Sequence, residues 1–127
     1  MSAAQILVVE DNEKNMKLVR DVLQASGYRL LEATTADRAV GLALEHEPDV
    51  VLMDIQLPDT DGVEALVRLR GNERTASIPV VALTAQAMDG DRERFLAAGF
   101  DGYISKPVSV AELLETVKER CRGRAAE

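Results

Sequence analysis

Short apolar runs recur along the chain, and a longer segment with helical spacing follows each of them. Three runs, at 6–9, 50–53 and 80–83, show no alternation of apolar and polar residues, which is typical of parallel strands covered on both faces. The run at 28–31 alternates more and the run at 102–104 is short, as expected of strands at the edge of a sheet. The pattern therefore predicts three central strands and two edge strands.

The segments between the runs carry their apolar residues on one helical stripe each. The predicted helices lie at about 16–23, 39–44, 63–70, 95–98 and 109–122. The last begins with Ser109 as N-cap and has Glu112 three residues later, which is the signature of a capping box. Gly27, Gly71 and Gly99 follow three of the helices, and a glycine commonly stands just past a helix end.

Strict alternation of strands and helices predicts an α/β fold with a parallel sheet and helices on both faces. Two helices on one face and three on the other give a doubly wound, flavodoxin-like sheet with strand order 2-1-3-4-5. A chain of 127 residues is long enough to bury about two thirds of the surface that it exposes when unfolded. We therefore expect a single domain over 1–127, with a core of about 5–122 and no output domain.

The acidic balance of the chain argues against nucleic acid as a direct partner. The formal net charge is −7, whereas affinity for a phosphate backbone depends on clustered Lys and Arg. Basic residues gather only near the end, where cations complement the macrodipole of a helix C-terminus. These residues are Lys118, Arg120, Arg122 and Arg124. Aromatic residues make up 3% of the chain and include no Trp, so no base-stacking surface is expected.

Cys121 is the one cysteine of the chain, which rules out a disulfide framework and is typical of a reducing compartment. The longest apolar runs fall far short of the ~20 residues that span a bilayer, so we expect no membrane insertion. The N-terminus has no charged region of the kind that opens a signal peptide. We therefore expect a cytoplasmic protein.

Polar side chains stand at the C-terminal ends of four predicted strands. Glu10 and Asp11 follow the first strand, Asp54 the third, Thr84 the fourth, and Lys106 lies just past the fifth. Ligands of doubly wound sheets bind outside these strand ends. We therefore expect three carboxylates, a hydroxyl and an ammonium to meet in one crevice.

This combination of groups suits phosphoryl transfer. Three crowded carboxylates repel one another until a proton or a cation relieves them, and a cluster of oxygen ligands favours Mg²⁺, or Mn²⁺. Asp54 can then act as a nucleophile toward phosphorus. Lys106 would pair with one phosphoryl oxygen and the Thr84 hydroxyl would donate to another.

Each of these residues also has a purely structural explanation. Asp11 or Asn12 can cap the first helix, Asp54 can end a strand through a side-chain turn, and Thr84 can cap a helix. Lys106 can be an ordinary solvated lysine. The coincidence of all of them at adjacent strand ends favours the chemical interpretation over the separate structural ones.

Two other functions fit the sequence less well. A phosphatase with an aspartyl nucleophile would need a second Asp two residues after Asp54 as its general acid, and Gln56 stands there. A flavin carrier would need a phosphate loop rich in Gly, Ser and Thr after the first strand, where this chain has Glu10 to Glu13. Docking without phosphorylation stays open as a third alternative.

Four segments in this order resemble the receiver domains of bacterial two-component response regulators. The segments are Glu10-Asp11-Asn12, Met53 to Pro58 with Asp61-Gly62, Thr84-Ala85, and Ile104 to Pro107. The resemblance covers about 5–122, and the combination is highly specific. Within the family, the chain is similar to single-domain regulators of the DivK type or to the receivers of hybrid kinases.

The resemblance implies a role for each residue of the cluster. Asp54 would be the phosphoacceptor, assisted by Thr84 and Lys106, and Thr84 and Tyr103 would form the switch. The implied metal ligands are Glu10, Asp11, Asp54 and the main-chain carbonyl of Gln56. Glu10 stands where the family more often has Asp, so its longer arm should favour contact with the metal through water. The Lys106–Pro107 peptide bond is often cis in the family.

The family also implies a signalling switch and not an enzyme, with self-catalysed phosphoryl transfer and autodephosphorylation only. The expected partners are a histidine kinase or histidine phosphotransfer protein and a downstream protein target, with a monomer or a weak phosphorylation-dependent dimer as the oligomeric state. The implied output face comprises the last helix, the strand before it and the helix before that. It includes Gln86, Ala87, Met88, Phe95 and Tyr103. We interpret His46 as a surface residue near a helix end and not as a phosphodonor.

Overall fold

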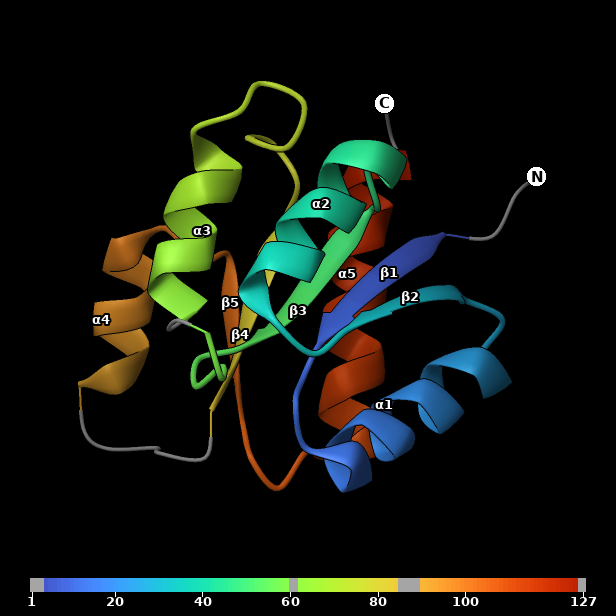
Figure 1. Ribbon diagram of the computed structural model, residues 1–127. Helices are drawn as coiled ribbons and strands as arrows, with labels where there is room; N and C mark the ends of the chain where they lie inside the picture. The colour runs from blue at the N-terminus through green and yellow to red at the C-terminus, as the bar shows by residue number, and fades with distance from the viewer. Residues whose placement is uncertain (1–3, 60–61, 85–89, 126–127) are drawn as a thin grey trace.

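Five strands and five helices alternate along the part of the chain that the structure describes (Figure 1). The computed structural model describes residues 4–59, 62–84 and 90–125. The elements are β1 (Gln5–Val9), α1 (Glu13–Ala25), β2 (Arg29–Ala33), α2 (Ala36–His46), β3 (Val50–Asp54), α3 (Gly62–Arg70), β4 (Val80–Thr84), α4 (Asp91–Ala98), β5 (Gly102–Ser105) and α5 (Val110–Ala125). The predicted strands are thus confirmed, each within two residues at either end.

All strand pairs are parallel and the sheet has the order β2-β1-β3-β4-β5. The predicted doubly wound order is therefore confirmed, with the alternating strand β2 and the short strand β5 at the edges. The register pairs Val9 with Met53, and Thr84 with Ser105. The C-terminal ends of the central strands consequently reach the same edge of the sheet.

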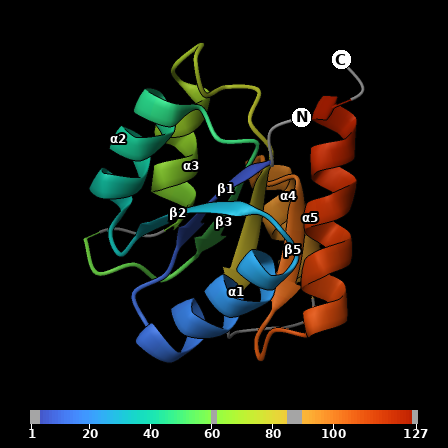
Figure 2. The same cartoon turned by 90° about the vertical axis from the view of Figure 1, so that its right-hand side faces the viewer.

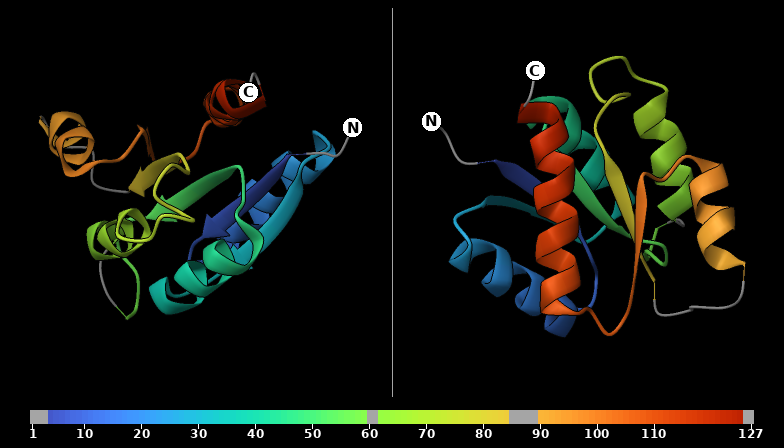
Figure 3. Two further views of the ribbon diagram at one scale, coloured as in Figure 1. Left: turned by 90° about the horizontal axis from the view of Figure 1, so that it is seen from above. Right: turned by 180° about the vertical axis from the view of Figure 1, so that it is seen from behind.

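Helices cover both faces of the sheet, with α2, α3 and α4 on one side and α1 and α5 on the other (Figures 2 and 3). Successive strand residues point to opposite faces, as the pleat requires. Leu7 and Val9 pack in the core under α2 and α3, whereas Ile6 and Val8 pack under α1 and α5. Both cores are apolar, which explains why β1, β3 and β4 lack alternation.

Helix ends follow the predicted signals. Asn12 is the N-cap of α1, and its side chain accepts a hydrogen bond from the Asn15 backbone N–H at 3.1 Å. The Ser109 hydroxyl accepts from the Glu112 N–H at 3.4 Å at the start of α5. Gly99 follows α4 with φ of 115°, a left-handed conformation that side chains disfavour. Among the described residues, no helix is both long enough and apolar enough to cross a membrane.

Candidate functional site

Backbone hydrogen bonds fix the strand ends that carry the predicted site residues. Glu10 directly follows β1, and its N–H donates to the Ala33 carbonyl at 3.0 Å. Asp54 is the last residue of β3 and pairs with Leu83 of β4. The Lys106 N–H donates to the Thr84 carbonyl at 2.7 Å, so the chain beyond β5 stays beside β4. The Lys106–Pro107 peptide bond is cis.

The structure brings the three predicted carboxylates together. One oxygen from each of Glu10, Asp11 and Asp54 lies within 4.8 Å of the others. Glu10 and Asp54 are only 1% and 5% exposed, whereas Asp11 is exposed. The cluster therefore has a buried floor and one arm that reaches solvent.

Lys106 lies between the two buried carboxylates. Its ammonium nitrogen is 2.6 Å from Glu10 Oε1 and 3.0 Å from Asp54 Oδ2. The contact with Asp54 is a hydrogen bond, and the contact with Glu10 is a short ion pair. The second oxygen of Asp54, Oδ1, accepts from the Gln56 N–H at 2.9 Å.

Burial and crowding shift the titration of two groups. Burial, followed by contact with the Asp54 carboxyl, raises the pKa of Glu10 to about 7. Burial works to lower the pKa of Lys106, but contacts with Glu10 and Asp54 outweigh burial and raise it. The site therefore holds a permanent ammonium beside a carboxylate that is readily protonated.

These donors fit a hard divalent cation. The cluster offers carboxylate oxygens without nitrogen or sulfur, and one oxygen from each of its three residues lies within 4.8 Å of the others. Such an oxygen can accept a hydrogen bond from a water on a bound cation. Mg²⁺ prefers a few carboxylates together with water and phosphate oxygens. The observed ligand set matches that preference.

A cleft of about 370 Å³ opens over the cluster. Its lining comprises Glu10, Asp11, Asn12, Asn15, Asp54, Gln56, Leu57, Pro58 and Lys106. Asn15 was not among the predicted site residues; it lies one turn after Asp11, which is the available sequence signal. Gly62 packs closely against the backbone at the end of β3, because a Cβ on it would meet the Asp54 carbonyl oxygen at 2.7 Å.

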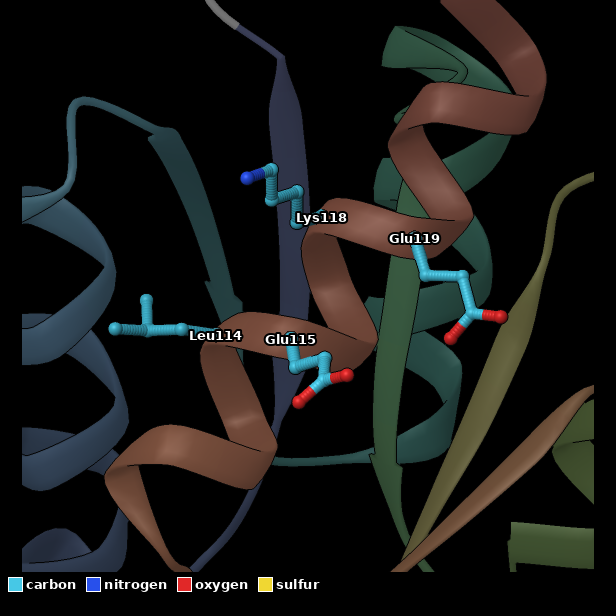
Figure 4. A pocket seen from close by; sticks show the side chains of 4 residues that line it. All are labelled: Leu114, Glu115, Lys118 and Glu119. Carbon is cyan, nitrogen blue, oxygen red and sulfur yellow. The ribbon is translucent and has the colours of Figure 1, made fainter.

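A second hollow, of about 560 Å³, lies on the surface of α5 (Figure 4). Its described lining is Leu114, Glu115, Lys118 and Glu119, all from this one helix. Leu114 and Lys118 point to one side of the helix and the two glutamates to the other. These four described side chains do not converge on one point, whereas carboxylates from three residues meet in the cleft at the strand ends.

The two predicted switch residues lie in different environments. Thr84 ends β4 and is 4% exposed. Tyr103 on β5 is half-buried and its ring stacks on Phe95 of α4, with centroids 5.7 Å apart. The placement of Phe95 on the output face was wrong, since Phe95 is 3% exposed and packs in the core beneath that face.

Several predicted positions lie outside the described residues. They are Ala85, Gln86, Ala87 and Met88 after β4, and Asp61 before α3. His46 ends α2 with a partly exposed imidazole, which confirms its interpretation as a helix-end residue.

Residues 6–118 match the family model of the response regulator receiver domain. The chain therefore belongs to the family of response regulator receiver domains, the receivers of two-component signalling, as the resemblance predicted.

Individual relatives agree with this assignment. The chain is 50% identical over 113 residues to the polar-differentiation response regulator DivK of Brucella ovis, an alignment that covers 89% of this chain and 92% of that protein. It is similar in structure to the receiver domain of sensor histidine kinase PA1611 from Pseudomonas aeruginosa, which has a magnesium ion coordinated in its active-site cleft. That likeness has a TM-score of 0.87 and 37% identity over 94% of this chain and 98% of that chain. The chemotaxis response regulator CheY4 of Vibrio cholerae gives a TM-score of 0.87 with 25% identity, covering 94% and 99% of the two chains.

Proposed function

We propose that the chain is a phosphoacceptor switch in which Asp54 takes a phosphoryl group beside Mg²⁺ or Mn²⁺. The observation that carries the proposal is the meeting of three carboxylate oxygens within 4.8 Å, with the Lys106 ammonium against two of the carboxylates. Glu10, Asp11, Asp54 and the main-chain carbonyl of Gln56 would hold the cation. When bound, the cation supplies neutralisation of the charge on the transferred phosphoryl group.

Asp54, Gln56 and Lys106 each have a separate role in the transfer of the phosphoryl group. A carboxylate oxygen of Asp54 attacks phosphorus, a new oxygen–phosphorus bond forms, and the bond from phosphorus to the donor breaks. The Gln56 N–H, 2.9 Å from Asp54 Oδ1, fixes the orientation of the nucleophile. Lys106 moves its contact from the carboxylates to a phosphoryl oxygen, where its charge stabilises the transition state.

Signalling follows from the residues that respond to the new charge. Phosphorylation adds roughly two negative charges at neutral pH. Thr84 turns its hydroxyl toward the phosphoryl group, and Tyr103 exchanges its position on Phe95 for an inward one. The surface formed by α4, β5 and α5 thereby shifts between two populations, which a downstream protein reads.

The phosphoryl group comes from a histidine on a partner kinase or a histidine phosphotransfer protein. The chain catalyses only its own phosphorylation and dephosphorylation, so it is a switch and not an enzyme with a separate substrate. A single cysteine provides no disulfide framework, and this composition fits a protein that receives its phosphoryl group in the reducing cytoplasm. We expect a monomer, or a weak dimer that depends on phosphorylation.

Intact mass spectrometry tests the acceptor. After incubation with acetyl phosphate and Mg²⁺, the wild-type chain should gain one phosphate-sized increment, and Asp54→Asn should gain none. Asp21→Asn is the matched control, because Asp21 is an exposed partner of Lys17 on α1 and should leave the gain unchanged. A gain that survives in Asp54→Asn, or that forms equally well in EDTA, would overturn the proposal.

A further inference from the structure

Asp59 reaches from the loop after β3 to the first turn of α2. Its Oδ1 atom accepts from the Ala36 N–H at 2.9 Å, and its Oδ2 atom accepts from the Asp37 N–H at 3.1 Å. The N-cap of the same helix, Thr35, accepts from the Arg38 N–H at 3.2 Å. Two acceptors from different parts of the chain therefore share the free N–H groups of this helix end.

The contact depends on a carboxylate. Hydrogen bonds from the backbone, that of Ala36 foremost, lower the pKa of Asp59. A negative charge is also stabilised at a helix N-terminus by the macrodipole. A neutral amide would offer one acceptor oxygen and no charge, so Asn would satisfy only half of the interaction.

The other end of this loop belongs to the candidate site. The Ile55 N–H donates to the Leu83 carbonyl at 3.0 Å, and the Gln56 N–H donates to Asp54 Oδ1 at 2.9 Å. Leu57 and Pro58 line the cleft, and Asp59 is the next residue. The loop is thus held at β4 and at Asp54 on the inner side, and at α2 on the outer side.

We propose that Asp59 is a positioning residue for the cation site, which it serves by fastening the loop that presents the Gln56 carbonyl. This inference rests on the proposed function, since it concerns the same cation. With Asp59 in place the peptide after Gln56 has little freedom to turn. Without it, Gln56, Leu57 and Pro58 are no longer tied to α2 through Asp59, and the Gln56 carbonyl gains freedom to rotate.

The contacts of Asp59 argue against a direct role as a metal ligand. Among the described residues, the carboxylates close enough to share an ion are those of Glu10, Asp11 and Asp54. Both oxygens of Asp59 are already used by backbone donors of α2. Asp59 therefore acts on the cation through the loop.

Calorimetric titration of Mg²⁺ against Asp59→Ala and Thr35→Ala separates positioning from helix capping. Both variants remove an acceptor from the first turn of α2, but only Asp59 belongs to the loop of the site. Asp59→Ala should weaken Mg²⁺ binding about tenfold, as loss of a partner outside the ligand shell commonly does. Thr35→Ala should bind Mg²⁺ within about twofold of wild type, and Asp59→Asn should fall between.

A second measurement makes the result independent of phosphorylation. The Gln56 amide resonance should shift in metal-free Asp59→Ala and stay in place in Thr35→Ala, provided that both variants show folded spectra. Unchanged Mg²⁺ affinity in Asp59→Ala would reduce Asp59 to a helix cap, and equal losses in both variants would assign the effect to α2. Failure of the wild-type chain to bind Mg²⁺ would instead defeat the proposed function itself.

Discussion

Lys106 contacts two carboxylates at once, and the two contacts are unequal. The distance to Glu10 Oε1 is 2.6 Å and the distance to Asp54 Oδ2 is 3.0 Å. Glu10 follows β1, the neighbour of the strand that ends in Asp54, and its longer arm lets it reach the same ammonium. At rest, Lys106 therefore supplies the positive charge that the carboxylates require, in the place where a divalent cation would act.

Removal of the Lys106 ammonium should strengthen the binding of Mg²⁺. In Lys106→Met the carboxylates keep their positions but lose a unit of positive charge a few ångströms away, so Mg²⁺ should bind on the order of tenfold more tightly. Phosphorylation by acetyl phosphate should become slower, because no ammonium is left to stabilise the phosphoryl oxygens. Calorimetry and timed mass spectra measure the two effects.

Lys17→Met is the control for the Lys106 variant. Lys17 pairs with Asp21 at 2.7 Å on the surface of α1, and more than half of each side chain is exposed. Its loss should change Mg²⁺ affinity very little, since exposed charges are screened. Mg²⁺ affinity that is unchanged or lower in Lys106→Met would show that the ammonium does not compete with the cation.

At the scale of elements, topology explains why most of the site was predictable. Residues that directly follow parallel strands reach one edge of the sheet, so Glu10, Asp54 and Lys106 could be placed from the strand pattern alone. The contact of Asp59 with Ala36 spans 23 residues and joins a loop to a helix, and no spacing rule indicates it.

Helix α4 shows a second limit of the sequence pattern. Its eight residues, DRERFLAA, begin with four charged residues, so Phe95 and Leu96 are its only large apolar side chains. Two adjacent apolar residues do not define which side of a short helix faces inward. The structure buries Phe95 at 3% exposure and leaves Leu96 at 41%, an assignment that depends on the contact of Phe95 with Tyr103 and Phe100.

Arg70 at the end of α3 joins elements at the N-terminal ends of the strands, whereas the cleft lies at their C-terminal ends. Its guanidinium donates to the carbonyls of Ala76, Ile78 and Gly99 at 2.9, 2.7 and 3.1 Å, and to the Asp101 carboxylate at 2.7 Å. Asp101 in turn accepts from the Val80 N–H at 2.8 Å at the start of β4. One side chain thus ties α3 to the entries of β4 and β5.

Replacement of Arg70 by Lys should destabilise the fold without damaging the site. A lysine ammonium cannot reproduce a fork that serves four acceptors, and loss of these bonds should lower the free energy of unfolding by about 2 kcal/mol. Arg74→Lys, at an exposed pair with Glu47, should change it by less than about 0.5 kcal/mol. Urea unfolding measures both values. Equal stability of the two variants, or loss of phosphorylation in folded Arg70→Lys, would contradict this separation of the two ends of the strands.

At the scale of the whole molecule, the site lowers the stability of the metal-free fold. Burial raises the pKa of Glu10 from its ordinary 4.5 to about 7, so the folded state holds this proton more tightly than the unfolded state does. A group of this kind contributes stability that is fully present below the unfolded pKa and is lost as pH rises through the folded pKa. The metal-free protein should therefore lose stability between about pH 4.5 and pH 7.

Glu10→Gln isolates this contribution, because the amide keeps the shape of the side chain and does not titrate. In EDTA, the free energy of unfolding of the wild type should fall relative to Glu10→Gln by about 2 kcal/mol between pH 5 and pH 8. This is less than the full shift would give, because pH 5 already lies above the ordinary pKa of Glu10, 4.5. Saturating Mg²⁺ should remove most of the difference at pH 8, where the cation takes over the charge balance that the proton provides at pH 5. Parallel stability curves for the two proteins in EDTA would mean that Glu10 is charged throughout, with Lys106 alone sufficient to balance the buried carboxylates.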